Sequence, residues 1–217
     1  MDEEALVLFA RSRLAPVLGD APVIWFHLAG GAFKSLLHGR SPRDLDLWPA
    51  TPLDRERLTS HLIQHGARLV RDNPPYQTSF THAGQLIEVA HDTSATSLED
   101  RLERFDIALS AIGVEHRAGA WRGAIHPVAV ESIRRREVLL LKPLVNWKYA
   151  LATLERLRRY AAELDFRVPQ EEEEGIWEMF TAQSRDEQKA MVARYVRVSR
   201  GDPRLLHEAR SRVGAGG

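Results

Sequence analysis

Apolar side chains follow two different periods along the chain, and the change comes near residue 126. Leu6, Phe9, Ala10 and Leu14 recur every three or four residues, which predicts a helix over 3–17. Short apolar or alternating runs bounded by Gly, Pro and Asn predict strands at 23–28, 45–48, 67–71, 77–82, 85–90, 105–114 and 119–125. Further helices are predicted at 32–37, 52–66 and 97–103.

Beyond residue 126 the pattern is almost wholly helical, with helices predicted at 127–135, 144–163, 172–199 and 203–212. The acidic run Glu171–Glu174 is either a linker or the solvated start of a helix. We therefore expect an α+β fold with two parts. A short mixed sheet with helices occupies residues 1–126, and a mostly helical part occupies residues 127–217.

Composition narrows the class of protein. Apolar residues make up 44% of the chain, which is typical of a globular protein with a core. There is no cysteine, so disulfides and thiolate metal sites are excluded, and a cytoplasmic location is expected. No apolar run approaches the roughly 18 residues that span a bilayer, so no membrane partner is expected. Lys and Arg balance Asp and Glu at 30 each, but Lys189 to Arg212 holds seven basic residues against two acids.

The stretch Phe26 to Trp48 carries the most informative chemistry: a strand, a Gly30-Gly31 turn, a short helix, and a strand containing Asp44 and Asp46. Glycines let a backbone approach a phosphate closely, and the start of the following helix favours an anion. Side chains two apart on a strand point to one side, so the two aspartates project together. Neighbouring carboxylates repel each other unless a cation lies between them, which predicts Mg²⁺ or Mn²⁺.

A third carboxylate is expected to complete such a metal site. Glu88 lies inside an apolar strand, where an isolated charge is costly and needs a reason. Asp92 and Asp106 are the alternatives for this role. Two metals held by shared carboxylates can stabilise both the attacking and the leaving oxygen of a phosphoryl displacement.

This segment resembles the head domain of the polymerase-beta-type nucleotidyltransferases, most of all the branch of CCA-adding enzymes and poly(A) polymerases. Gly30-Gly31, Leu37-His38-Gly39-Arg40 and Asp44-Leu45-Asp46 match the Gly-Gly turn, the Leu-x-Gly-Arg run and the Asp-x-Asp strand of that family. Lys34 stands where the family has Arg. Arg104-Phe105-Asp106 resembles the Arg-Arg-Asp-Phe-Thr motif, and the segment from Leu154 to Phe166 resembles a later helix that carries Arg156 and Arg159.

The resemblance implies transfer of a nucleotide from an NTP to an acceptor hydroxyl. Asp44, Asp46 and Glu88 would be catalytic and hold the metal. The nucleotide would be bound by Gly30, Gly31, Lys34, Arg40, Arg104, Asp106, Arg156 and Arg159. The family's base-selecting Glu-Asp-x-x-Arg motif is not found, and few residues follow Phe166. We therefore expect the family's tRNA-binding body to be missing, and expect a minimal nucleotidyltransferase rather than a CCA-adding enzyme.

The acceptor stays open at this point. The 3′ end of an RNA such as tRNA is favoured. A small molecule or a protein is the alternative, as in antibiotic-modifying enzymes and toxins. A non-catalytic module that binds a nucleotide is a third reading, although a fold that only binds has little reason to keep three clustered acids.

Overall fold

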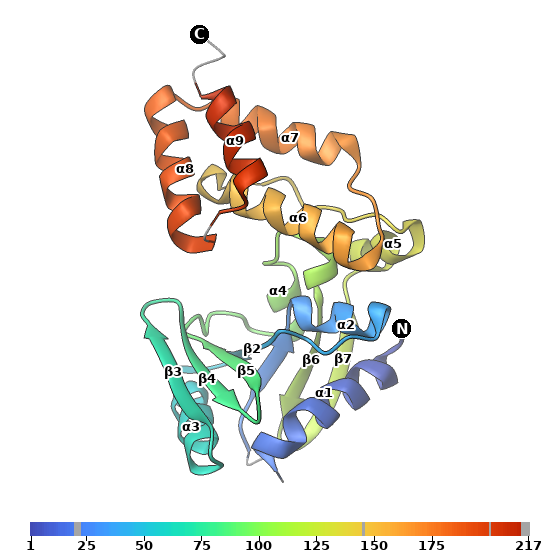
Figure 1. Ribbon diagram of the computed structural model, residues 1–217. Coiled ribbons are helices and arrows are strands. Elements are labelled where there is room, and N and C mark those ends of the chain that lie inside the picture. Colours follow the sequence, from blue (N-terminus) through green and yellow to red (C-terminus); the bar gives the residue numbers. More distant parts are fainter. Residues whose placement is uncertain (20–22, 145, 200, 214–217) are drawn as a thin grey trace. The chain divides into compact units, whose positions relative to one another are not determined.

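The computed structural model describes residues 1–19, 23–144, 146–199 and 201–213. The chain divides into two compact units, Met1–Val130 and Glu131–Gly217. The predicted α+β class is confirmed, because strands and helices are mixed in the first unit and the second is helical (Figure 1).

A seven-stranded sheet in the order β3-β4-β5-β2-β1-β6-β7 forms the centre of the first unit. Every neighbouring pair is antiparallel except β2 and β5, which run parallel. The strands are β1 (Phe26–Ala29), β2 (Asp44–Pro49), β3 (Arg68–Asn73), β4 (Gln77–His82), β5 (Gln85–Ala90), β6 (Ile112–Arg117) and β7 (Ala120–Ile125).

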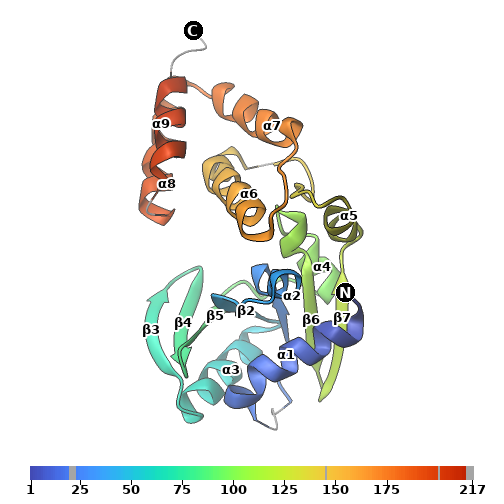
Figure 2. The same cartoon turned by 45° about the vertical axis from the view of Figure 1, so that its right-hand side comes forward.

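Helices cover the two faces of this sheet differently. The helices α1 (Glu3–Leu18) and α3 (Pro52–Gln64) lie against one face, as Figures 1 and 2 show. Leu6 of α1 lies 3.2 Å from the position that a Cβ would take on Gly123 of β7. The short α4 (Leu98–Leu102) lies on the opposite face, where Leu98 approaches Gly113 of β6 in the same way, at 3.2 Å.

Most of the predicted elements of the first unit are present. The strands at 77–82 and 85–90 have the predicted bounds. The helix predicted at 32–37 is a 3₁₀ turn, Gly31–Lys34, followed by α2 (Ser35–His38). The strand predicted at 105–114 is wrong in its first half. A 3₁₀ turn at Ala108–Ser110 bends the chain there, and β6 begins only at Ile112.

The second unit consists of helices. α5 (Pro127–Arg135) crosses the boundary between the units, and α6 (Ala150–Leu164) follows a 3₁₀ turn at Trp147–Tyr149. The chain then forms α7 (Gln170–Thr181), α8 (Arg185–Ser199) and α9 (Pro203–Arg212). Of the predicted helix 144–163, residue 145 lies outside the described residues.

Two features of the second unit depart from the pattern of the sequence. The single helix predicted over 172–199 is wrong, because a new helix, α8, begins after Ser184. The Ser184 N–H and hydroxyl donate to the Glu187 carboxylate, and the Glu187 N–H donates to Ser184 Oγ, which together form a capping box. The run Glu171–Glu174 lies inside α7 and is therefore no linker. The unit is held together by Leu151, Leu154 and Leu157 of α6, which are almost fully buried.

Candidate active site

Strand β2 presents its two aspartates on one face of the sheet. Asp44 and Asp46 are half-buried, whereas Leu45 and Leu47 between and beyond them are fully buried on the face that α1 and α3 cover. The period of two along a strand explains this alternation. The pattern of β2 therefore places both carboxylates on the face opposite the one that α1 and α3 cover.

The Gly30 turn lies directly against Asp46. Gly30 has φ 128° and ψ −158°, a backbone conformation that only glycine adopts readily. A Cβ built on Gly30 would lie 2.8 Å from Asp46 Oδ2, closer than real Cβ atoms come to their neighbours. The turn after β1 and the acid on β2 therefore form one local unit.

The parallel pairing of β2 with β5 brings Glu88 beside Asp46, since these two residues are register partners. Register partners in neighbouring strands point to the same face. Ser79 Oγ on β4 donates to Glu88 Oε1 at 3.3 Å. Burial, and after it the charge of Asp44, raises the pKa of Glu88 above its usual range. These acids therefore act on one another electrostatically.

Asp44 has a neighbour that the sequence did not point to as a partner. Arg43 Nε and Nη2 lie 2.9 and 2.8 Å from Asp44 Oδ2. The Arg43 side chain is 70% exposed, whereas that of Asp44 is 18% exposed. An incoming cation at Asp44 would compete with this guanidinium.

The chemistry of these groups fits a divalent cation such as Mg²⁺, because carboxylate oxygens are its preferred protein ligands. The carboxylates fit a divalent cation by the type of ligand atom and by their negative charge. Across the part of the chain that the structure describes, no three His, Asp or Glu side chains gather closely enough to hold a metal ion. The conformation described here therefore sets the acids near one another without bringing three of them onto one point.

The two alternative third acids are placed differently. Asp92 Oδ2 accepts from Arg101 Nη1 at 3.0 Å, and Asp92 Oδ1 accepts from Ser94. Asp106 is half-buried in the turn between α4 and the 3₁₀ turn at Ala108–Ser110. Glu88 is thus the one of the three acids that pairs with the strand of Asp46.

The basic residues of the first unit that were predicted to bind the nucleotide fall into two groups. Lys34 ends the 3₁₀ turn that follows Gly30 and is half-buried, and Arg40 is exposed just after α2. Arg104 instead pairs with Asp100 at 2.8 Å and donates to the Ser94 carbonyl at 3.0 Å. Only the first group lies on the segment that continues from the Gly30 turn.

Arg156 and Arg159 lie on α6 in the second unit. Arg156 donates back to its own helix, to the Ala152 carbonyl and to Thr153 Oγ1, each at 3.4 Å. Arg159 is half-buried, and its Nε has no hydrogen-bond partner within the described residues. The neighbouring Arg158 bridges Glu173 (2.7 Å) and Glu208 (2.9 Å) and ties α6 to α7 and α9.

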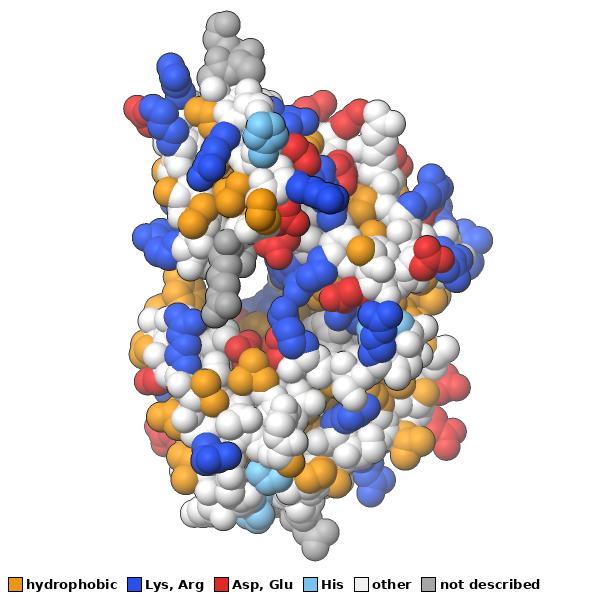
Figure 3. Space-filling view, viewed as in Figure 1, with side chains coloured by type: hydrophobic (Ala, Val, Ile, Leu, Met, Phe, Trp, Pro, Cys, Tyr) orange, Lys and Arg blue, Asp and Glu red, His pale blue; other side chains and the backbone are white. Residues whose placement is uncertain are grey.

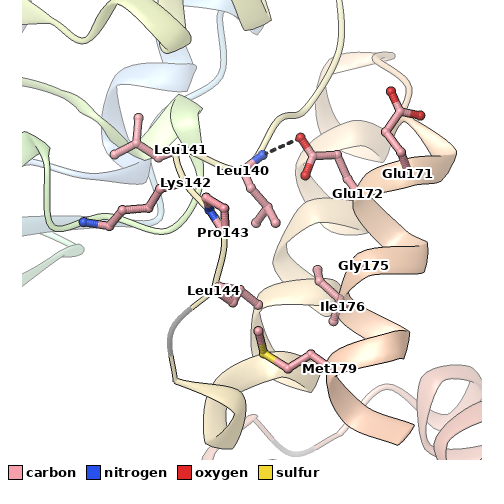
Figure 4. A pocket seen from close by; sticks show the side chains of 10 residues that line it. All are labelled: Leu140, Leu141, Lys142, Pro143, Leu144, Glu171, Glu172, Gly175, Ile176 and Met179. Carbon is pink, nitrogen blue, oxygen red and sulfur yellow. Dashed lines mark hydrogen bonds between the residues drawn. The ribbon is translucent and has the colours of Figure 1, made fainter. Parts of the chain in front are cut away.

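The second unit also holds an apolar cavity of about 430 Å³ between residues 140–144 and α7. Leu140, Leu144, Ile176 and Met179 line it, and the Leu140 N–H donates to Glu172 Oε1 at 3.2 Å (Figure 4). None of the residues predicted to bind metal or nucleotide lies in this cavity.

Sequence reasoning missed Ser79, which donates to Glu88, and Gln77, whose side chain lowers the pKa of Glu88 against the effect of burial. The signal was present, because these residues are two apart on β4 and so share a face. Pairing β4 against β5 through the Ala83-Gly84 turn would have set Ser79 opposite Glu88.

No protein-family model matches the chain, and no curated protein matches its sequence. The structure, however, is similar to solved structures of tRNA-processing enzymes. A CCA-adding enzyme without ligand superposes with a TM-score of 0.63 at 14% identity, covering 95% of this chain and 51% of that one. The CCA-adding enzyme of Thermotoga maritima, complexed with tRNA, gives 0.59 at 16% identity, covering 98% and 52%.

A third similar structure is a tRNA nucleotidyltransferase complexed with a primer tRNA and an ATP analogue. Its TM-score is 0.57 at 16% identity, and the match covers 93% of this chain and 59% of that one. The chain thus spans between half and three fifths of the length of these three proteins. No helix of the described residues is long and apolar enough to cross a membrane. The resemblance read from the sequence is confirmed at the level of structure: the chain has the fold of part of the CCA-adding enzymes and tRNA nucleotidyltransferases.

Proposed function

We propose that this protein is a metal-dependent nucleotidyltransferase that transfers a nucleotide from an NTP to an acceptor hydroxyl. The observation that carries the proposal is the junction of three elements. The Gly30 turn touches Asp46, Asp46 pairs with Glu88, and Asp44 lies on the same face of β2. The similarity of the fold to tRNA nucleotidyltransferases supports the same reaction class.

In the proposed reaction the acceptor oxygen bonds to the α-phosphorus of the NTP. The bond from that phosphorus to the bridging oxygen breaks, and pyrophosphate leaves with the electron pair. The acceptor proton passes to the Glu88 carboxylate. Gly30, Gly31 and Lys34 would hold the β- and γ-phosphates through backbone N–H groups and one ammonium group.

Asp44, Asp46 and Glu88 would hold Mg²⁺ or Mn²⁺. Bound divalent cations would neutralise the triphosphate and stabilise the attacking and leaving oxygens. The protein's own part is to hold the carboxylates near one another on the neighbouring strands β2 and β5, which limits the rearrangement that metal binding requires.

We propose the 3′ end of an RNA as the acceptor. Exposed basic residues of the second unit support this choice. Lys189, Arg197, Arg204 and Arg210 are exposed on α8 and α9, where Lys and Arg side chains are frequent in Figure 3. Basic side chains attract a phosphate backbone and make binding dependent on salt.

A transfer assay tests the proposal. Each α-labelled NTP is incubated with Mg²⁺ or Mn²⁺, total RNA and either the unaltered protein or Asp46→Asn. Asp72→Asn is the matched control, because Asp72 is an exposed acid on the edge strand β3. We expect label on RNA with the unaltered protein and with Asp72→Asn, and none with Asp46→Asn.

Transfer that survives in Asp46→Asn would refute the assigned site. Absence of label on RNA from every NTP would refute the RNA acceptor. The same labelled NTPs would then be offered with aminoglycosides and with protein extracts to test the two other acceptor classes.

A further inference from the structure

Trp48 is the next residue after Asp46 on the same face of β2, and its indole N–H donates a hydrogen bond to the last residue of β1. The backbone pairing of β1 with β2 runs from Phe26 to Leu28 and stops there. The carbonyl of the following residue, Ala29, instead accepts from Trp48 Nε1 at 3.1 Å. At the point where β1 leads into the Gly30 turn, the Trp48 side chain therefore supplies the hydrogen bond that the backbone of β2 supplies earlier along the strand.

The other side of the turn is held by backbone. Gly30 N–H donates to the Ile112 carbonyl at 3.3 Å. The Ala29–Gly30 peptide therefore lies between a backbone acceptor on one side and the Trp48 indole on the other. Because Asp46 Oδ2 lies against Gly30, a shift of this peptide would move the contact with Asp46.

The indole itself is held from α4. The Arg101 guanidinium lies 4.0 Å from the centre of the Trp48 ring, and Phe105 meets that ring edge to face at 6.0 Å. Arg101 is only 5% exposed and is anchored by Asp92 at 3.0 Å. A buried cation on an aromatic face is a stronger contact than an exposed one.

We infer that Trp48 is a positioning residue, and that Arg101 and Asp92 hold it so that its indole N–H fixes the Gly30 turn against Asp46. This role rests on the proposed function for its effect on catalysis, but the effect on the turn is independent of it. Asp92 thus serves the site through Arg101 rather than as a ligand.

The test uses Trp48→Phe, which keeps an aromatic ring and removes the indole N–H. Trp25→Phe is the matched control, because Trp25 Nε1 also donates to a neighbouring strand, to Glu115 Oε2 at 3.1 Å, away from the turn. Hydrogen–deuterium exchange of the peptide covering residues 28–34 reports on the turn. Steady-state transfer reports on catalysis.

We expect faster exchange of residues 28–34 in Trp48→Phe but not in Trp25→Phe. We also expect kcat to fall about tenfold while KM for the NTP changes less, as for loss of placement in the transition state. Arg101→Lys keeps the charge beside Asp92 and loses the planar stack, so it should loosen the same peptide. It also serves if Trp48→Phe does not fold.

Unchanged exchange of residues 28–34 in both Trp48→Phe and Arg101→Lys would overturn the inference. Equal acceleration in Trp25→Phe would do the same, because the effect would then be general destabilisation. If the unaltered protein transfers no nucleotide, the proposed function fails, and the exchange comparison still decides whether Trp48 fixes the turn.

Discussion

Replacing Gly30 with alanine tests whether the turn and Asp46 form one functional unit. The substitution has two costs. The φ of 128° and ψ of −158° place Gly30 in a region that other residues adopt at a cost of about 1–3 kcal/mol. In addition, the new Cβ would lie 2.8 Å from Asp46 Oδ2, so the carboxylate or the turn must move.

A second glycine separates these two costs. Gly84, in the turn between β4 and β5, has φ 82° and nothing within 4 Å of the position of a Cβ. Gly84→Ala should therefore lose only about 1–2 kcal/mol of folding free energy from backbone strain. Both variants should unfold at lower urea concentration, but only Gly30→Ala should displace a carboxylate of the site.

A misplacement of about 1 Å at a reacting centre can cost about 100-fold in rate. We expect Gly30→Ala to lose transfer activity by about that factor at a temperature where urea titration shows both variants folded, and Gly84→Ala to keep nearly all of it. Single-turnover transfer from a labelled NTP is the assay. Equal activity in the two variants would refute the reasoning, because the contact with Asp46 would then have no functional consequence.

Three further predictions concern charge. Arg43→Gln should lower the Mg²⁺ concentration for half-maximal activity by about two- to fivefold, the range of an exposed ion pair, because the cation no longer competes for Asp44; an unchanged requirement in a Mg²⁺ titration would contradict this. Burial lowers the pKa of His27 below its usual value of 6.5. Just below that pH the unfolded chain therefore binds more protons than the folded chain, and the free energy of unfolding decreases as the pH falls through 6.5. The melting temperature of His27→Gln should therefore fall less than that of the unaltered protein between about pH 7.5 and about pH 5.5, on either side of the usual histidine pKa. Arg158→Leu should lower the free energy of urea unfolding by about 1 kcal/mol, because it leaves the two glutamates that it bridges without their half-exposed partner; an unchanged midpoint would count against that bridge.

Local pattern was enough to predict some elements. The Ala83-Gly84 turn separates the strands at 77–82 and 85–90, and both strands have the predicted bounds. The pattern failed at 105–114, where apolar residues at alternate positions suggest a strand although the chain bends through a 3₁₀ turn. Every residue from 107 to 112 is buried. A fully buried strand and a fully buried turn are both apolar, so the hydrophobic pattern does not distinguish them.

The missed break in the helix 172–199 has a different cause. Ser184 and Glu187 form a capping box that the sequence displays openly as Ser-x-x-Glu. The apolar stripe before and after it continues with helical spacing, and that continuity hid the break. Here the local Ser-x-x-Glu motif was the better guide to the helix boundary than the helical spacing of the apolar residues.

The pairing of Glu88 with Asp46 could not be read from local pattern, because β5 reaches β2 only after α3 and a hairpin. It is nevertheless fixed by the core. Ile87 and Val89 are fully buried on the face opposite Glu88. A slip of one residue in β5 would turn them toward the acidic face and bury Glu88 in the core, at the cost of an isolated charge in an apolar environment. The same apolar alternation that stabilises the sheet therefore sets which of the three candidate acids stands beside Asp46.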